Sequence, residues 1–191
     1  HVHTYSIGYF CLKTAKKCNV KARIAHSHNN QTVKDKKYLF KKILQKIYTI
    51  YATDLLACST EAGEYLFKEK KFEVVKNAID TDKFIFNKGI RENIRKQLNL
   101  SDSIVIGNVG RLHEQKNQMF LLDIFSFLKK KEKKIKLMII GNGPLEKQLK
   151  EKTTTLGIEN DVIFMGNRKD INVLYQAMDL LLFPSLFEGL G

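Results

Sequence analysis

Two cations, Arg111 and Lys116, lie in a turn between a predicted strand and a predicted helix. The turn, residues 107–117, reads GNVGRLHEQKN; the apolar run 104–106 precedes it, and an amphipathic run, 119–128, follows it. The first turn of a helix offers unpaired backbone N–H groups and the positive end of the helix dipole. Because Arg and Lys add charge-assisted hydrogen bonds, the segment predicts a site for two adjacent phosphates, such as those of a nucleotide-linked substrate.

Three other groups of polar or glycine residues also follow apolar runs, at 26–29, 141–143 and 188–191. In an open parallel sheet, ligands bind beyond the carboxyl ends of the strands. One glycine-rich turn by itself is more often a tight connection between a strand and a helix. Several such turns at the same edge of one sheet are a stronger indication of a binding site.

Apolar runs of strand length alternate with segments of helical periodicity along the chain. We expect one strand to end near residue 26 and others at 54–58, 74–75, 104–109, 135–140, 162–164 and 180–183. We expect helices over 39–50, from 59 or 60 onward, and over 121–128, 145–155 and 171–178. Strands that are apolar throughout and separated by helices predict an α/β protein with parallel sheets covered on both faces. Ile139–Ile140 and Leu180–Phe183 are expected to be core strands.

The polar connection around residues 79–88 is the best candidate for a domain boundary. We place residues 1–84 in the C-terminal part of one domain and residues 85–191 in most of a second domain. The chain begins without an initiator Met or a signal-peptide pattern, and it stops directly after an apolar strand. It is therefore expected to be a fragment of a longer protein, with both domains incomplete.

The net charge of +13 arises mainly from lysines, which cluster at 34–46 and 129–136. The plain interpretation is solvated helix faces, and the alternative is attraction to an anionic membrane surface. Nucleic acid is disfavoured as a partner because Arg is scarce in both clusters and no known binding module is present. No run approaches the roughly 18–20 apolar residues of a membrane span. We expect a cytoplasmic protein, with peripheral contact with the cytoplasmic membrane face left open.

The three cysteines, Cys11, Cys18 and Cys58, are odd in number and lack the spacing of metal ligands. Free thiols in a reducing, cytosolic environment are the plain interpretation. The cysteine pattern therefore gives no reason to expect a metal site.

The 107–117 segment resembles the G-x-V-G-R-L-x-x-x-K-N signature of retaining glycosyltransferases of family 4, the glycosyl transferases group 1. Other segments resemble the family in the same order: 139–144 (IIGNGP), 162–166 (VIFMG) and 183–191 (FPSLFEGLG), which is similar to the start of its E-x7-E motif, together with 1–3, 23–29 and 77–80. The resemblance covers essentially the whole chain and implies the GT-B architecture of two Rossmann-like parallel-sheet domains. Through residues 23–29 the chain is similar to bacterial enzymes that make capsular polysaccharide or exopolysaccharide.

The resemblance implies that Arg111 and Lys116, together with Gly110, hold the donor diphosphate and offset the charge that grows on the leaving group. Glu188 matches the first Glu of the E-x7-E motif, which contacts hydroxyls of the donor sugar, and we assign it to catalysis. The backbone that follows it is expected to contact phosphate and sugar, at Gly189, Leu190 and Gly191. The plainer alternatives are surface cations that cap nearby acids and a carboxylate at a helix start.

His26 matches a first-domain His that lies over the reaction centre in the family, and we also assign it to catalysis. A structural His at a strand end is the alternative. His3, His28 and Asn29 are expected on the acceptor side. Six residues are expected on the nucleobase side: Gly141, Asn142, Gly143, Gly166, Asn167 and Arg168.

The resemblance implies a retaining hexosyltransferase that moves a sugar from a nucleotide sugar, expected to be a UDP-sugar, to a glycan or lipid-linked acceptor in polysaccharide biosynthesis. Because cations replace Mg²⁺ in the family, no metal or other cofactor is expected, and no protein base is assigned. The family's second Glu lies beyond this chain, so these 191 residues alone are expected to have little or no activity. Two alternatives stay open: a UDP-sugar epimerase of GT-B fold and a non-catalytic anion-binding subunit.

Overall fold

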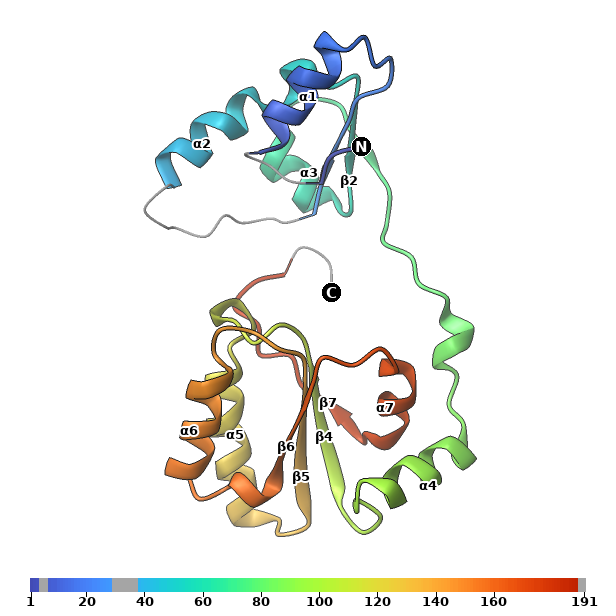
Figure 1. Cartoon of the computed structure of the whole chain (residues 1–191), viewed down its shortest axis with the longest axis vertical. Helices are drawn as coiled ribbons and strands as arrows, with labels where there is room; N and C mark the ends of the chain where they lie inside the picture. The colour runs from blue at the N-terminus through green and yellow to red at the C-terminus, as the bar shows by residue number, and fades with distance from the viewer. Residues whose placement is uncertain (4–6, 29–37, 189–191) are drawn as a thin grey trace. The chain divides into compact units, whose positions relative to one another are not determined.

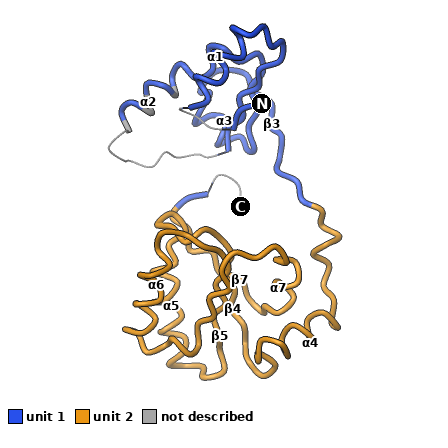
Figure 2. Tube along the Cα trace, in the orientation of Figure 1, with its two compact units in different colours: residues 1–79, 187–191 blue, residues 80–186 orange. Residues whose placement is uncertain are grey.

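The structure, a computed structural model, describes residues 1–3, 7–28 and 38–188 (Figure 1). The chain divides into two compact units, residues 1–79 with 187–191 and residues 80–186 (Figure 2). The domain boundary expected from the sequence lies five residues later, after residue 84. The short 3-10 helix η2 (Thr81–Phe84) belongs to the second unit, where the Phe84 ring lies 5.9 Å from the Tyr175 ring.

The first unit contains a three-stranded parallel sheet in the order β1-β2-β3. Its elements are β1 (Ile24–Ser27), β2 (Asp54–Ala57), β3 (Glu73–Val74), α1 (Gly8–Lys17), α2 (Tyr38–Ile47), α3 (Thr60–Phe67) and the 3-10 helix η1 (Tyr48–Tyr51). Leu12, Tyr48, Leu66 and Phe67 from the helices pack on the small sheet residues Ala25 and Ala57. The Ser59 hydroxyl accepts a hydrogen bond from the Ala62 N–H at 3.2 Å and caps α3.

The second unit contains a four-stranded parallel sheet in the order β6-β5-β4-β7. Its strands are β4 (Ile104–Val109), β5 (Ile135–Ile140), β6 (Val162–Gly166) and β7 (Leu180–Leu181). Its helices are α4 (Lys88–Gln97), α5 (Gln118–Lys131), α6 (Glu146–Thr155) and α7 (Ile171–Ala177), with the 3-10 helices η3 (Glu114–Lys116) and η4 (Glu159–Asp161). The parallel sheets confirm the predicted α/β class.

The β4–β5 pair is apolar on both faces because helices cover both faces (Figure 1). On one face, Ile106, Leu137 and Ile139 pack with residues of α5 and α6. On the other face, Val105, Met138 and Ile140 pack with residues of α4 and α7. This alternation explains why these two strands read as continuous apolar runs rather than as alternating ones.

Helix α4 is an element that the sequence interpretation missed. Asn87 caps it by accepting a hydrogen bond from the Ile90 N–H at 3.0 Å. Arg91 and Arg95 then reach across to Asp179, and Arg95 Nη1 lies 3.0 Å from Asp179 Oδ2. The helix is polar on most positions, so its attachment depends on these long-range ion pairs and on the buried Ile94.

The expectation that Leu180–Phe183 forms a core strand is wrong in two respects. Strand β7 comprises only Leu180–Leu181, and it pairs with β4 alone, at the edge of the described sheet. Leu180, Leu181 and Phe183 are exposed, because an edge strand of two residues lacks neighbours on its outer side. By contrast, Ile139 and Ile140 are buried, as expected for a central strand.

The second lysine cluster is partly structural. Lys129 and Lys136 donate to the same carboxylate oxygen of Asp161, at 2.9 and 2.8 Å. Burial alone raises the pKa of Asp161, but the hydrogen bonds from Lys136 and Lys129 outweigh it and leave the pKa below its usual value. Across the described parts of the chain, the helices are too short or too polar to span a bilayer.

Candidate functional site

Three turns join at the carboxyl edge of the second unit's sheet. We call residues 110–117, which follow β4, the cation loop. The Gly110 N–H donates to the Ile140 carbonyl at 2.9 Å, and the Leu112 N–H donates to the Asn142 carbonyl at 2.9 Å. The Gly141 N–H in turn donates to the Gly166 carbonyl at 2.8 Å. The backbone itself therefore fixes the cation loop against the turns that follow β5 and β6.

Gly141 and Gly143 allow this close approach because they have no side chain. A Cβ on Gly141 would stand 2.0 Å from the Gly110 carbonyl oxygen, and Gly141 has a φ of +134°. A Cβ on Gly143 would stand 2.2 Å from the Leu112 carbonyl oxygen. Packing thus accounts for both glycines, and their expected place on the nucleobase side stays a prediction.

The cation loop returns on itself, so that Lys116 lies over Gly110. A Cβ at Gly110 would be 3.6 Å from both Cδ and Cε of Lys116, which places the lysine stem beside the residue that precedes Arg111. Leu112 is fully buried and anchors the loop, while Arg111 is exposed and Lys116 is partly buried. Lys116 therefore lies beside the residue that precedes Arg111, and the joint role of the two cations at a diphosphate stays a prediction.

Helix α5 begins one residue before the amphipathic run 119–128 that predicted it, but it does not directly follow Arg111. The short helix η3 intervenes, Asn117 adopts a left-handed conformation at φ 54°, and α5 begins only at Gln118. The first turn of α5 is thus seven residues beyond Arg111 and two beyond Lys116. Of the two cations, only Lys116 is next to the helix start in the chain.

Amide side chains that the sequence interpretation passed over connect the cation loop to residues 182–186. Asn108 donates to the Leu182 carbonyl at 2.7 Å, and Asn117 donates to the Pro184 carbonyl at 3.2 Å. The Leu186 N–H donates to the Gln115 carbonyl at 2.8 Å. Gln118 Nε2 supports the loop by donating to the Arg111 carbonyl at 3.1 Å. In the sequence, an Asn within the otherwise apolar strand 104–109 was the feature that could have indicated such a contact.

These contacts fix the chain just before Glu188, which is partly buried. Within the part of the chain that the structure describes, Gln118 Oε1 and Ser185 Oγ are buried without a hydrogen-bond partner. Because buried polar atoms are normally paired, both are candidates for a hydrogen bond with a ligand or a water molecule. Gly189, Leu190 and Gly191 lie outside the described residues.

The remaining nucleobase-side residues differ in their surroundings. Gly166 ends β6 with a φ of +64°, and Asn142 and Asn167 are exposed. Arg168 donates two hydrogen bonds to Asp170, at 2.8 and 2.6 Å. This bidentate pair lowers the pKa of Asp170 and raises that of Arg168. Arg168 therefore has a partner in its own loop, and a contact with a base would compete with it.

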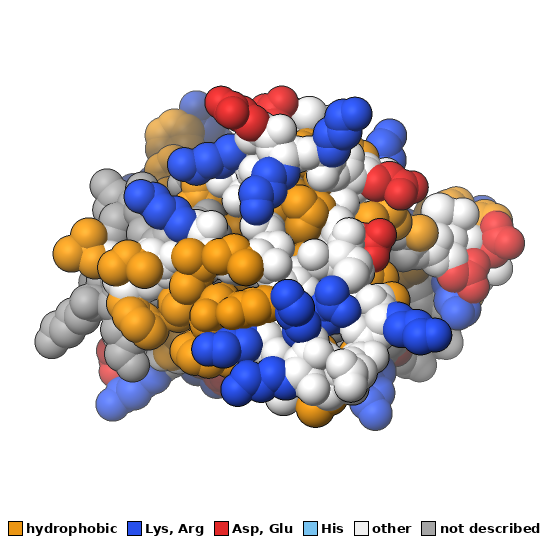
Figure 3. Space-filling model, turned by 90° about the horizontal axis from the view of Figure 1, so that it is seen from above, with side chains coloured by type: hydrophobic (Ala, Val, Ile, Leu, Met, Phe, Trp, Pro, Cys, Tyr) orange, Lys and Arg blue, Asp and Glu red, His pale blue; other side chains and the backbone are white. Residues whose placement is uncertain are grey.

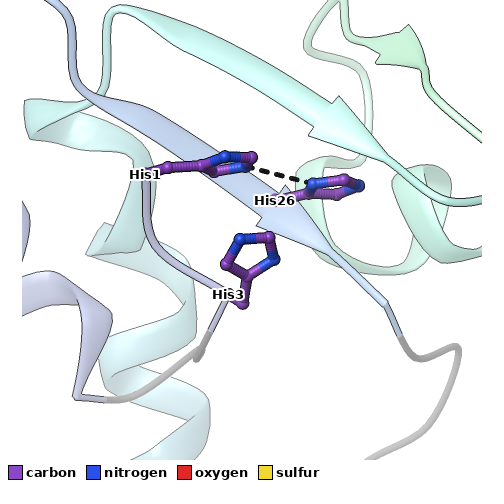
Figure 4. Close-up of side chains that lie close together, drawn as sticks. All are labelled: His1, His3 and His26. Atoms are coloured by element: carbon purple, nitrogen blue, oxygen red, sulfur yellow. Dashed lines mark hydrogen bonds between the residues drawn. The ribbon is translucent and has the colours of Figure 1, made fainter. Parts of the chain in front are cut away.

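The first unit brings together the histidines that the sequence placed at a strand end, and it adds His1. Residue Val2 pairs with Ala25 beside β1, so the His1 and His3 side chains reach His26 (Figure 4). His1 Nε2 and His26 Nδ1 are 3.1 Å apart, and His3 Nδ1 and His28 Nε2 are 2.7 Å apart. We call these four residues the histidine cluster. Asn29 lies outside the described residues.

Burial and mutual repulsion favour the neutral form of two of these rings. Burial lowers the pKa of His26, and the nearby charges of His28 and His3 lower it further. Burial and the charge of His3 lower the pKa of His28 in the same direction. His26 can therefore act as a neutral hydrogen-bonding group near pH 7. Its burial fits the structural alternative equally well.

A family model and individual relatives of this chain both belong to the glycosyltransferases. The model of the family described as glycosyl transferases group 1 matches residues 90–191. The capsular polysaccharide biosynthesis glycosyltransferase CapM of Staphylococcus aureus is 30% identical over 84% of this chain and 45% of its own length. The Escherichia coli UDP-Gal:alpha-D-GlcNAc-diphosphoundecaprenol alpha-1,3-galactosyltransferase is 28% identical over 100% of this chain and 52% of its own. The chain thus spans about half the length of the curated relatives it matches.

The fold of this chain also matches that of solved glycosyltransferase structures. The crystal structure of Anabaena HepE in complex with UDP-glucose superposes with a TM-score of 0.79 at 20% identity, covering 95% of this chain and 51% of that protein. At this identity the likeness shows the fold, and together with the parallel sheets it identifies the chain as an α/β protein of the GT-B type.

Proposed function

Because the chain belongs to the glycosyl transferases group 1 family, we propose that its parent protein moves a sugar from a UDP-sugar to a glycan or lipid-linked acceptor in polysaccharide biosynthesis. We include in this proposal a retaining, family 4 type of hexosyl transfer. The single observation that carries it is the cation loop, in which Lys116 folds back over Gly110 beside Arg111.

The chemistry assigned to this loop is stabilisation of a leaving group. When the bond between the sugar and the diphosphate breaks, negative charge grows on the departing nucleoside diphosphate. Arg111 and Lys116 would offset that charge with hydrogen bonds between charged groups, each contributing about 1.5–3 kcal/mol. Two cations on one fixed loop would serve where other transferases use Mg²⁺, so transfer requires no metal in this proposal.

Glu188 and His26 are the groups that we assign to the sugar. The Glu188 carboxylate would accept hydrogen bonds from sugar hydroxyls and favour positive charge at the anomeric carbon. His26, held largely neutral by burial, would donate or accept one hydrogen bond without adding a repelling charge. Neither residue is assigned as a nucleophile or as a base, in agreement with attack on the face from which the diphosphate departs.

The names of relatives support the choice of substrates. The Escherichia coli relative is named for a UDP-galactose donor and a diphosphoundecaprenol-linked acceptor, and CapM is named for capsular polysaccharide biosynthesis. HepE was crystallised with UDP-glucose. A lipid-linked acceptor is presented at a membrane, so we place the protein in the cytoplasm, at the cytoplasmic face of that membrane.

Exposed apolar side chains near lysines support this peripheral location. Helix α2 and the residues after it expose Leu39, Phe40, Ile43 and Ile50. Figure 3 shows hydrophobic side chains gathered next to basic ones on the face that it views. Apolar side chains flanked by cations are suited to the surface of an anionic bilayer.

The experiment that tests the function is an assay of the full-length protein with labelled UDP-sugars, with and without a diphosphoundecaprenol-linked sugar. Transfer predicts that UDP is released only with the acceptor, and that the new glycosidic bond keeps the donor's anomeric configuration. Isomerisation of the UDP-sugar without an acceptor would establish the epimerase alternative. Salt-sensitive binding to polyanions without affinity for UDP would instead indicate an anion-binding subunit.

A further inference from the structure

The histidine cluster has the composition of a transition-metal site. One ring nitrogen from each of His1, His3 and His26 lies within 4.8 Å of the other two (Figure 4). His1 and His3 are exposed, and His26 is 5% exposed at the end of β1. The three rings thus form a shallow site with a buried floor and two ligands that an ion can reach from solvent.

From this arrangement we propose that His1, His3 and His26 bind a divalent transition metal, with Zn²⁺ as the physiological ion. Imidazole nitrogens are preferred ligands of Zn²⁺, Cu²⁺ and Ni²⁺, and three His ligands with one open position are a common zinc arrangement. The proposal rests on the geometry of the first unit, and zinc on His26 would compete with the sugar contact proposed above for the same side chain.

The spacing of the nitrogens fits coordination. Two nitrogens bound to zinc at about 2.1 Å with tetrahedral angles are separated by roughly 3.4 Å. His1 Nε2 and His26 Nδ1 are already 3.1 Å apart, so they require only a small adjustment to share an ion. The His26 Nε2 atom, by contrast, is buried without a hydrogen-bond partner among the described residues. Metal binding therefore uses the side of the ring that already faces the other histidines.

His28 is a positioning residue in this site. Its Nε2 lies 2.7 Å from His3 Nδ1, so a proton on His3 Nδ1 leaves the other His3 nitrogen with a lone pair for the metal. Metal-bound histidines commonly hold their second nitrogen in this way. Both nitrogens must be unprotonated to bind zinc, so the proton between His1 Nε2 and His26 Nδ1 moves to the other nitrogen of its own ring, and zinc binding weakens at acid pH, where the rings are protonated.

A zinc titration of the full-length protein, measured by calorimetry at pH 7.5 after treatment with a chelator, tests the proposal. The exposed Cys11 and Cys18 are changed to Ser, because thiols also bind zinc. We expect one zinc ion per chain. His3→Ala and His26→Asn should each weaken binding at least tenfold, and His28→Ala should weaken it less.

His113 supplies the matched control, because it is the one histidine of the sequence that lies in the second unit. His113→Ala should leave zinc affinity unchanged. Replacement of zinc by Co²⁺ should give the visible spectrum of nitrogen ligation without a thiolate charge-transfer band.

Equal zinc affinity in the wild type and His3→Ala, or an equal loss in His113→Ala, would overturn the proposal. His3 is exposed, so His3→Ala decides the question even if His26→Asn fails to fold by circular dichroism.

Discussion

Gly141 packs on Gly110 so closely that a β-carbon on Gly141 would lie 2.0 Å from the Gly110 carbonyl oxygen. Because Gly110 directly precedes Arg111, the turn after β5 determines where the first cation of the loop begins. The same contact explains why the 141–143 turn is glycine-rich without requiring a ligand there.

Gly141→Ala should therefore displace the cation loop and destabilise the chain. The left-handed φ and the clash with backbone together should cost about 2 kcal/mol or more of unfolding free energy. Gly157→Ala is the matched control, because Gly157 has a φ of +66° with nothing within 4 Å of an added Cβ. That variant should lose only about 1 kcal/mol, from the left-handed conformation alone. Urea denaturation of both variants gives the comparison, and equal losses would contradict the proposed packing role.

Arg111→Ala and Lys116→Ala should each weaken UDP binding by the full-length protein at least tenfold, or about 1.4 kcal/mol. The reason is the loss of a charged hydrogen-bond donor to the diphosphate. Isothermal titration calorimetry with UDP measures the effect. Lys147→Ala removes an equally basic side chain that makes a long ion pair with Glu151, at 3.9 Å, and should leave affinity unchanged. Unchanged affinity in both loop variants would remove the roles given to these cations.

Asn108→Ala should reduce stability and UDP-sugar affinity together. The Asn108 side chain is buried and donates to the Leu182 carbonyl, which would be left unpaired at a cost of about 1–3 kcal/mol. Denaturant titration and calorimetry on the same samples test both effects. Asn93→Ala, on the exposed side of α4, should change stability by less than about 0.5 kcal/mol. A stability loss with wild-type affinity would show that the 182–186 segment can move without effect on the donor.

Asp179→Asn should lower stability near neutral pH by about 2 kcal/mol, less than a fully buried pair would lose, because Asp179 is about one-third exposed. Burial alone raises the pKa of Asp179, but hydrogen bonds from the Val105 N–H, Arg95 and Arg91 outweigh it and hold the pKa below its usual value. A carboxyl with a lowered folded-state pKa stabilises the protein above its unfolded pKa of about 3.9 and loses that effect as the pH falls through the folded value.

The stability difference between wild type and Asp179→Asn should therefore be constant above about pH 5 and shrink below about pH 4. Thermal or urea unfolding across this range gives the profile. Asp102→Asn, at an exposed position, serves as the control and should show little difference at any pH. If the difference in unfolding free energy between the wild type and Asp179→Asn stays the same at the lowest pH, Asp179 is not ionised in the folded protein.

The sequence predicts best those elements whose side chains face the core. Strands β4 and β5 were found within their observed bounds because both faces are apolar. Helix α4 was missed because its attachment depends on Arg91 and Arg95 binding Asp179, more than eighty residues away. Nothing local in the sequence shows such a partner.

The candidate site divides in the same way. The types of residue in the cation loop predicted a phosphate site. The polar residues at the end of β1, His26 among them, predicted a second group of ligand-binding side chains at a strand end. The hydrogen bonds of Asn108 and Asn117 were not predictable, because they join residues separated by 74 and 67 positions. The positions of Gly141 and Gly143 against backbone carbonyls likewise depend on how strands pair.

The two hydrogen bonds from Asn108 and Asn117 also limit how this protein can be recombined with its relatives. They couple residues 104–117 to residues 180–188, so these two stretches should come from the same parent protein, although they are far apart in the sequence. A chimera that exchanges only one of the two stretches would take the amide donor from one parent and the backbone carbonyl that accepts its hydrogen bond from the other. Exchange of both together preserves the match, so crossover points between residues 118 and 180 should yield fewer working hybrids than points outside that interval.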